Sequence, residues 1–323
     1  MAYRFGALVL CAALACGDDS APPIDFRIDL NFPEVGPDAP DVPEMGAELG
    51  RDLRVPDRAV PFSVMTWNVE NFFDSRNDPD TGDEVFSNLV VEQKIANIAE
   101  VIRAADPDFI ALQEVENEPL VARLVNDGLS GMGYENFGLM DSFDGRGIDV
   151  AYISRNPVNA VVSQLGERFD GPDGPQFFTR DALEVFVDVG GTEVLVMTSH
   201  FISQASSGSD GRRLGEAQQV QDILRRRVGA VPRVLFVADL NDTPDSPTYD
   251  AIVNGGVLTD HTLQIPSSDR WTFIFRGREQ QLDYAFGSVT MVSELQRVEI
   301  PRGASVERTS DHYPVVARFV INP

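Results

Sequence analysis

The chain has 323 residues, and its hydrophobic content of 43% is ordinary for a globular protein with a substantial core. Its formal net charge is −25, from 26 basic and 51 acidic residues. Such an acidic surface repels polyanions, which argues against a protein that coats nucleic acid through a broad basic face. It does not exclude an enzyme that acts on phosphate esters, because a bound divalent cation can supply positive charge locally.

The first segment of the chain, residues 1–16, has the pattern of an export signal. Arg4 precedes an apolar run, residues 5–14, that is too short to span a bilayer as a helix. Both cysteines of the chain, Cys11 and Cys16, lie in this segment, so the remainder can form neither an internal disulfide nor a cysteine metal site. The cysteines therefore bear on targeting rather than on the fold.

Residues 13–16 resemble a bacterial lipoprotein signal, in which Cys16 is lipidated and tethers the protein to a membrane. Ala13 stands where such signals usually carry leucine, and a plain secretory signal cleaved near Ala15 is the alternative. We therefore expect an exported protein, either an outer-membrane or cell-surface lipoprotein or a secreted one.

Residues 17–59 contain seven prolines and eleven acidic residues. A segment of this composition buries too little apolar surface to offset the entropy lost on ordering. We expect a disordered acidic tether, or an unstructured leader without a role of its own. Residues 60–323 contain no second linker of this kind, and we expect them to form one folded domain that is monomeric.

Strand-like and helix-like patterns alternate along this domain. In chain order, they predict a strand at 62–67, a helix at 90–105, a strand at 108–113, a helix at 117–128, strands at 134–140, 148–154, 158–166, 181–189 and 193–199, a helix at 211–228, and strands at 234–238, 281–287, 289–299 and 314–321. Many strands with fewer helices predict an α/β (α+β) domain in which two mixed sheets pack face to face with helices outside.

Polar residues gather at the ends of these apolar strands, and the ends of strands at one edge of a sheet converge on one place. A single aspartate there is more often a turn residue or helix cap, and a single histidine is more often structural. However, two of the three histidines stand at strand ends beside other polar residues. The set comprises Asn68, Glu114, His200, Asp239, Asn241, Asp283, Asp311 and His312.

Six segments resemble, in order, the motifs of the endonuclease/exonuclease/phosphatase superfamily: Thr66–Glu70, Leu112–Val115, Thr198–His200, Ala238–Pro244, Leu282–Tyr284 and Ser310–Pro314. Each motif is short and unspecific alone, but together they extend over nearly all of residues 62–320. The local patterns at 68–73 and 146–151 are most similar to secreted bacterial nucleases. The resemblance implies a DNase I-like four-layer sandwich in residues 60–323, with phosphoester hydrolase activity.

The resemblance also implies a divalent metal site. Glu114 is expected to be the principal ligand, Asn68 to assist through its amide oxygen, and Asp311 to add a further carboxylate. A hard cation prefers oxygen ligands and keeps several waters, which suits Mg²⁺ or Mn²⁺, with Ca²⁺ as a supporting ion. The metal is expected to stabilise the negative charge of the transition state.

For the catalytic groups, the resemblance assigns His312 to the scissile phosphate and to activation of the attacking water. Asp283 is expected to orient the imidazole of His312. Asp239 and Asn241 are expected to position the water and the phosphate.

His200 matches the second histidine of DNase I-like members, a candidate general acid for the leaving oxygen. Asp149 is expected to be its acidic partner. The apurinic-site endonuclease branch usually has tyrosine at the position of His200, so the histidine favours the DNase I, sphingomyelinase and secreted-nuclease branches. Candidate phosphate contacts, each also explicable as a surface arginine, are Arg146, Arg180 and either Arg212 or Arg213.

We expect a nuclease for which DNA or RNA is a substrate rather than a stably bound partner. The alternative is the same chemistry on a lipid or small substrate, as in a sphingomyelinase or a sugar-phosphate phosphatase. An exposed aromatic hairpin would favour a lipid; residues 271–275 are a candidate, although their pattern predicts a buried strand. A binding module that has lost catalysis is a third hypothesis, which the complete set of candidate residues disfavours.

Overall fold

The computed structural model describes residues 58–322. The expected signal at 1–16, with Cys16, and nearly all of the expected tether at 17–59 lie outside this range. In the part of the chain that the structure describes, no helix is both long and apolar enough to cross a membrane.

The first of two six-stranded sheets has the order β15-β16-β1-β2-β4-β3. Its strands are, in that order, Leu295–Glu299, Val315–Ile321, Val60–Phe72, Phe109–Val115, Asp149–Ser154 and Asn136–Met140. The sheet is mixed, because β1 runs parallel to β2 and antiparallel to β16.

The second sheet has the order β11-β14-β10-β9-β8-β5 and is also mixed, because β10 runs parallel to β9 and antiparallel to β14. Its strands are, in that order, Thr259–Asp260, Asp283–Gly287, Val234–Asp239, Thr192–His200, Ala182–Val189 and Val158–Val162.

The two sheets pack against each other through one apolar core. Phe62 and Val64 of β1 point into it from the first sheet, and Val196 of β9 and Leu235 and Val237 of β10 from the second. Because strand side chains alternate between faces, the opposite faces need separate cover.

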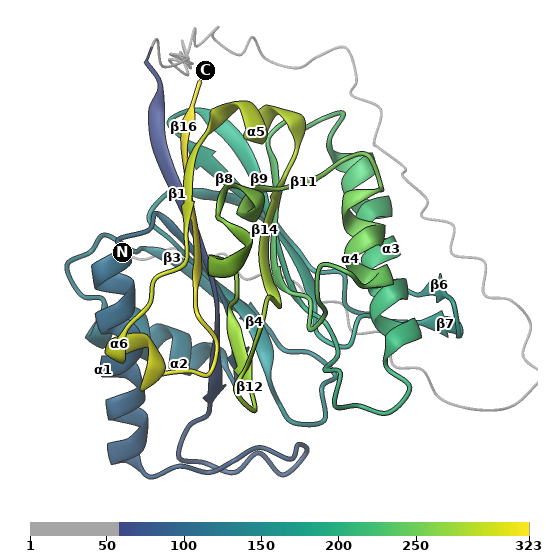
Figure 1. The fold of residues 1–323 in the computed structure, drawn as a ribbon. Helices are drawn as coiled ribbons and strands as arrows, with labels where there is room; N and C mark the ends of the chain where they lie inside the picture. Colours follow the sequence, from purple (N-terminus) through teal and green to yellow (C-terminus); the bar gives the residue numbers. More distant parts are fainter. Residues whose placement is uncertain (1–57, 323) are drawn as a thin grey trace, which may run out of the picture. The chain divides into compact units, whose positions relative to one another are not determined.

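Helices cover the outer faces of both sheets. On the first sheet, α1 (Asn88–Ala105) and α2 (Glu118–Arg123) bury a second apolar cluster, and on the second sheet α3 (Asp210–Arg227) and α4 (Pro247–Val253) bury a third. Figure 1 shows the two pairs of helices on opposite sides of the paired sheets. The expected four-layer sandwich is therefore confirmed.

The remaining elements are short. They comprise the hairpin strands β6 (Phe169–Gly171) and β7 (Gly174–Gln176), the hairpin strands β12 (Phe273–Phe275) and β13 (Arg278–Gln280), the helices α5 (Val289–Glu294) and α6 (Ala304–Glu307), a π-helical turn at Leu124–Gly128, and 3-10 helices at His261–Gln264 and Ser267–Asp269.

Two of the predicted strands were wrong in part. Residues 289–294 form α5 instead of the first half of a strand: Met291 and Glu294 are buried while Val289 and Val292 are exposed, a helical period. Residues 273–275 do form a strand, but apart from a single bridge between Phe273 and His312 it pairs with β13, in a two-stranded arm that leaves Ile274 and Phe275 about half exposed.

Candidate active site

The register of the strands brings the predicted site residues to one edge of the sandwich. Asn68 on β1 lies opposite Gln113 on β2, so Glu114 follows directly beside it. In the second sheet, Asp239 on β10 lies opposite both His200 on β9 and Asp283 on β14. One open cleft between these strand ends is lined by side chains from both sheets.

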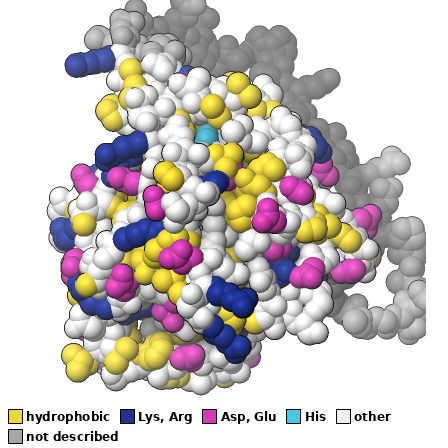
Figure 2. All heavy atoms as spheres, in the orientation of Figure 1, with side chains coloured by type: hydrophobic (Ala, Val, Ile, Leu, Met, Phe, Trp, Pro, Cys, Tyr) yellow, Lys and Arg dark blue, Asp and Glu magenta, His cyan; other side chains and the backbone are white. Residues whose placement is uncertain are grey.

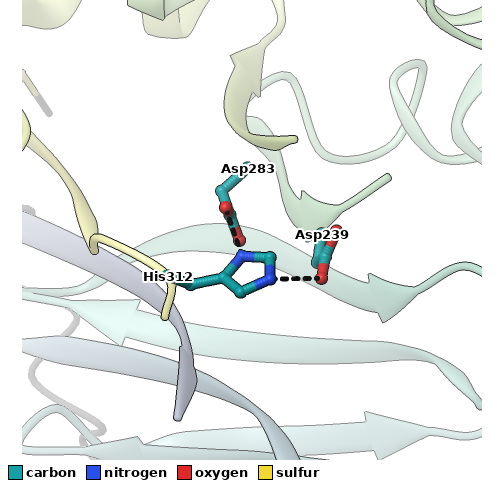
Figure 3. A group of neighbouring side chains, drawn as sticks. All are labelled: Asp239, Asp283 and His312. Carbon is teal, nitrogen blue, oxygen red and sulfur yellow. Dashed lines mark hydrogen bonds and ion pairs between the residues drawn. The ribbon is translucent and has the colours of Figure 1, made fainter. Parts of the chain in front are cut away.

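Three buried side chains form the centre of this cleft. Asp283 Oδ2 lies 2.8 Å from His312 Nδ1, and Asp239 Oδ2 lies 3.9 Å from His312 Nε2 on the other side of the ring. Figure 3 shows the imidazole held between the two carboxylates. The contact with Asp283 holds Nδ1 of the ring, and the opposite edge, with Nε2, points toward Asp239.

The charges of this group are strongly coupled. Burial lowers the pKa of His312, but Asp283 and Asp239 together outweigh it and raise the pKa to about 10. Burial, with Asp283 as a second cause, raises the pKa of Asp239 to about 7. In the metal-free protein at neutral pH, His312 is therefore a cation and Asp239 is poised to exchange a proton.

The loop that carries His312 is fixed onto β1. Trp67 Nε1 donates to the His312 carbonyl at 3.0 Å, and Ser310 Oγ donates to the Asn68 carbonyl at 2.7 Å. The His312 amide donates to Ser310 Oγ at 3.0 Å. The bonds from Trp67 and Ser310 join residues that are more than 240 positions apart in the sequence, which explains how the first and last motifs meet.

A second group of side chains in the cleft is acidic and partly open to solvent. Glu114 accepts from the Asn71 amide at 2.9 Å and from Asn68 Nδ2 at 3.4 Å. Glu70, which the sequence analysis did not select, accepts from the Asp311 amide at 3.1 Å. Burial raises the pKa of Asp311 to about 6, with Glu70 and Glu114 acting in the same direction.

Asn68 connects the two groups. Its Nδ2 donates to Asp239 Oδ2 at 3.0 Å as well as to Glu114, and its Oδ1 accepts from the Glu70 amide at 2.9 Å. Asn241 is fixed nearby, since its amide donates to Asp239 Oδ1 at 2.8 Å and its Nδ2 donates to the Phe201 carbonyl at 3.0 Å.

The backbone of the cleft is strained at four positions. Among residues 58–322, six non-glycine residues have positive φ, and four of them line this cleft: Glu70, Asn71, Glu114 and Asn241. Such conformations cost on the order of 1 kcal/mol or more each and concentrate at functional sites. Irregular pairing of β1 with β2 between Asn68 and Phe72 accompanies them and redirects the side chains.

His200 is placed in the cleft, but not with the partner that we expected. Its Nε2 lies 3.4 Å from Asp239 Oδ2, while its Nδ1 has no hydrogen-bond partner among the described residues. Asp149 instead accepts from the Ser142 amide at 2.8 Å, so the expected pairing of Asp149 with His200 is wrong. Burial raises the pKa of Asp149 to about 7, so it readily carries a proton without a charged partner.

The electrostatics of His200 differ from those of a general acid. Burial, followed by the nearby Arg180, holds its pKa well below the usual value. A ring whose pKa is held this low stays neutral and is not a ready source of protons, although its Nε2 lies close to Asp239.

The four candidate arginines separate into two pairs. Arg146 and Arg180 line the cleft; Arg146 lies 3.7 Å from Glu114 Oε2, and Arg180 forms an ion pair with Asp144 at 2.9 Å. Arg212 and Arg213 do not line it. Arg213 is buried and holds the loop after His200 through Ser209 and Asp242, and Arg212 donates to Thr179.

With this geometry established, comparison of the sequence with known families is decisive. The sequence profile of the endonuclease/exonuclease/phosphatase family matches residues 63–260. The chain belongs to the endonuclease/exonuclease/phosphatase family. The match ends before Asp283, Asp311 and His312, which the structure brings to the same cleft as the matched motifs.

Solved structures support the family's fold. A family protein from Bacteroides thetaiotaomicron is 19% identical, with 82% of this chain and 96% of that one covered and a TM-score of 0.56. TDP2 from Caenorhabditis elegans is 17% identical, with 81% of this chain and 74% of that one covered and a TM-score of 0.54. A mannosyl-6-phosphatase from Bacteroides thetaiotaomicron is also 17% identical, with 81% of this chain and 100% of that one covered and a TM-score of 0.56. At these identities the likeness concerns the fold alone. Among curated proteins, none matches the chain.

Members of the endonuclease/exonuclease/phosphatase family hydrolyse phosphoester bonds with the help of a divalent metal. The acidic group fits such an ion, because Glu70, Glu114 and Asp311 offer only oxygen atoms, which hard cations prefer. Asn68 Oδ1 accepts one hydrogen bond and keeps a second lone pair for a ligand. In the absence of a cation, Glu70 and Glu114 add to the effect of burial in raising the pKa of Asp311.

A second possible ligand group consists of Asp239, Asp283 and His312, whose ligand atoms lie within 4.8 Å of one another. All three are buried, and His312 Nδ1 is already bonded to Asp283. This arrangement suits proton exchange better than a hydrated ion.

Several residues in or beside the cleft are not among those predicted from the sequence: Glu70, Asn71, Lys94, Ser203 and Phe273. Glu70 shares the face of β1 with Asn68 two positions earlier, and that period could have identified it. Lys94 on α1 donates to the Thr309 carbonyl at 2.5 Å and lies near Glu70, Glu114 and Asp311. Phe273 packs on His312, and nothing in its sequence context indicates this.

Proposed function

We propose that this phosphoester hydrolase is an exported or surface-tethered nuclease that uses Mg²⁺ or Mn²⁺ to cleave phosphodiester bonds in DNA or RNA. The observation that carries the proposal is the composition of the cleft. Oxygen ligands for a metal lie beside an Asp-oriented histidine, and two arginines line the same cleft. Each of these groups has a role in transferring a phosphoryl group to water.

The proposed mechanism assigns a role to each group. Glu70, Glu114 and Asp311 would hold the metal ion, which would supply positive charge to a non-bridging phosphate oxygen. Asp239, with its pKa near neutrality, accepts a proton from the water that attacks phosphorus. As the new P–O bond forms, the bond from phosphorus to the leaving oxygen breaks, and that oxygen takes a proton from solvent in the open cleft. His312, held in one orientation by Asp283, donates from Nε2 to the phosphate and stabilises its added charge.

Neutral groups and arginines complete the cleft. Asn68 and Asn241 hold Asp239 in place through hydrogen bonds from Nδ2 and from the backbone amide. Arg146 and Arg180 neutralise the flanking phosphates of a chain substrate. His200 places its Nε2 3.4 Å from Asp239 Oδ2, the oxygen to which Asn68 donates.

The acidic composition of the protein is compatible with a nucleic-acid substrate that is released after each cleavage. On the face in Figure 2, basic and acidic side chains are interspersed rather than gathered into one basic surface. We infer that affinity is concentrated in the cleft. Export, and a membrane tether through a lipidated Cys16, are proposed from the sequence of residues 1–16.

A lipid phosphodiester is the second candidate substrate. It is favoured by the half-exposed Ile274 and Phe275 of the β12–β13 hairpin, which is the type of feature that a lipid-directed enzyme would carry. The family's chemistry is the same for both substrates, so the distinction depends on what binds beside the phosphate.

The direct test is hydrolysis by the purified domain. We expect nicking of supercoiled plasmid DNA, or cleavage of RNA, in Mg²⁺ or Mn²⁺, and complete loss of activity in EDTA. Glu114→Gln removes a ligand charge and should lower kcat by at least about a hundredfold. The matched control is Glu118→Gln, an exposed carboxylate at the start of α2, which should leave the rate unchanged.

If neither nucleic acid is cleaved under any of these metals while sphingomyelin is hydrolysed, the nuclease proposal is wrong. If Glu114→Gln and Glu118→Gln are equally active, the assigned metal site is wrong.

A further inference from the structure

We propose that the β12–β13 hairpin is a stacking subsite for a nucleobase next to the scissile phosphate. This inference rests on the proposed nuclease function and specifies how the substrate is recognised. It concerns an arm that lies outside both six-stranded sheets and that has no role in the proposed chemistry.

The base of the hairpin is tied to the catalytic pair. Thr272 Oγ1 accepts from the amides of Leu282 and Asp283 at 3.0 and 3.1 Å, and the Thr272 carbonyl accepts from the Tyr313 amide at 2.7 Å. The hairpin therefore starts from a fixed position relative to both Asp283 and the residue that follows His312.

A row of flat side chains extends from this base. The ring of Phe273 lies 4.7 Å from the imidazole of His312, centroid to centroid, and also lines the cleft. The ring of Phe275, two residues further along the same face, lies 6.3 Å from Phe273 at an interplanar angle of 13°. Phe275 is 51% exposed, so the row ends in an aromatic ring that is about half open to solvent.

The charges around this face suit a nucleic acid. The guanidinium of Arg276 lies over the Phe275 ring at 5.0 Å, and Arg278 is the strand partner of Phe275. Aromatic rings that stack bases beside arginines that meet phosphates are the usual construction of single-strand binding surfaces. A base stacked on Phe275 would be separated from the phosphate bound at His312 by the ring of Phe273.

The tip of the hairpin argues against insertion into a lipid bilayer. Its two turn residues, Arg276 and Gly277, both have positive φ, which is the geometry of a tight type I′ turn. The most protruding part of the arm is thus cationic, whereas insertion into lipid requires an apolar tip. Ile274 is the one aliphatic side chain exposed on the arm.

The test compares Phe275→Ala, Phe275→Trp and wild type with a single-stranded oligonucleotide that carries 2-aminopurine. In EDTA, wild type should quench the fluorescence of the stacked base, Phe275→Ala should not, and Phe275→Trp should. In Mg²⁺, KM should rise roughly tenfold for Phe275→Ala with kcat little changed. The control is Phe177→Ala, an aromatic of similar exposure, 45%, that does not line the cleft and should behave as wild type.

The proposal predicts a matching result with a modified substrate. Replacing the bases of the oligonucleotide with abasic spacers should raise KM of wild type by about the factor seen for Phe275→Ala, and should not further affect the variant. Equal KM values for all variants, on an oligonucleotide that wild type cleaves, would overturn the stacking subsite while leaving the nuclease function intact.

The lipid alternative is separated by vesicles of phosphatidylcholine and sphingomyelin. If wild type sediments with them, Phe275→Ala does not, and no 2-aminopurine quenching occurs, the hairpin contacts lipid and the stacking proposal is wrong. Failure of wild type to cleave any nucleic acid would instead contradict the proposed function itself.

Discussion

At the scale of single residues, the three histidines show how environment decides chemistry. His312 lies between two carboxylates and its pKa is raised to about 10, whereas burial holds the pKa of His200 well below the usual value. His261 is buried against Phe319, and neither of its ring nitrogens has a hydrogen-bond partner among the described residues. Burial alone lowers its pKa to about 4, so His261 is a core residue rather than a functional one.

His261 should make stability depend on pH. Between pH 6.5 and about 4, His261 is protonated in the unfolded chain but stays neutral in the folded protein. The free energy of unfolding is therefore highest above pH 6.5 and decreases as the pH falls toward 4. The difference between the two pKa values corresponds to a decrease of about 3 kcal/mol in the free energy of unfolding over this range. His261→Leu should therefore lose less stability than wild type between pH 8 and pH 5, measured by urea unfolding. A parallel loss in both proteins would contradict this assignment.

The site residues were predicted from the sequence where a motif and a strand end coincided. Asn68 and Glu114 are brought together by the register of the first sheet, Asp239 and Asp283 by that of the second, and His312 comes just before the last strand. The pairing of Asp149 with His200 failed because it depends on side-chain direction across two sheets, which strand patterns do not encode.

At the scale of elements, long apolar runs and helical periods predicted most strands and the two long helices. The failures are short or locally determined elements. The seven-residue α4 starts at Pro247 and is capped by Ser246, whose side chain accepts from the Tyr249 amide. The sequence contains this start signal, but the apolar pattern that follows it is too short to predict a helix. The β12–β13 arm depends on a two-residue turn rather than on a core.

Helix α1 contributes to the metal site through Lys94. Its ammonium group donates to the Thr309 carbonyl and faces Glu70, Glu114 and Asp311. Lys94→Met should lower the Tm of the metal-free protein by several degrees, because three carboxylates lose their cationic neighbour. Added Mn²⁺ should then raise the Tm of Lys94→Met by more than it raises the Tm of wild type, as measured by calorimetry.

The comparison variant is Arg103→Met, at the other end of the same helix, where the side chain bonds to the Gly128 carbonyl. It should be destabilised without any change in the response to Mn²⁺. Identical metal responses in Lys94→Met and wild type would remove Lys94 from the site.

At the scale of the whole molecule, the chain carries a net charge of −25, whereas the cleft holds two arginines. A nuclease with many basic contacts loses affinity steeply as salt displaces it from phosphates. Here the long-range field repels the substrate, and salt screens that repulsion. We expect kcat/KM for DNA to stay level or rise between about 50 and about 200 mM salt. A fall of roughly a thousandfold over this range would indicate a broad basic surface instead.

Lys94 is the only lysine in the chain, so its ε-amino group is a unique target for acylating reagents within the described domain. Burial lowers its pKa, and the adjacent carboxylates counteract that effect. A dication seated among those carboxylates would cancel their influence and leave the amine more often unprotonated and nucleophilic. The acylation rate of one residue, followed by mass spectrometry, would thus report occupancy by metal before any substrate has been identified.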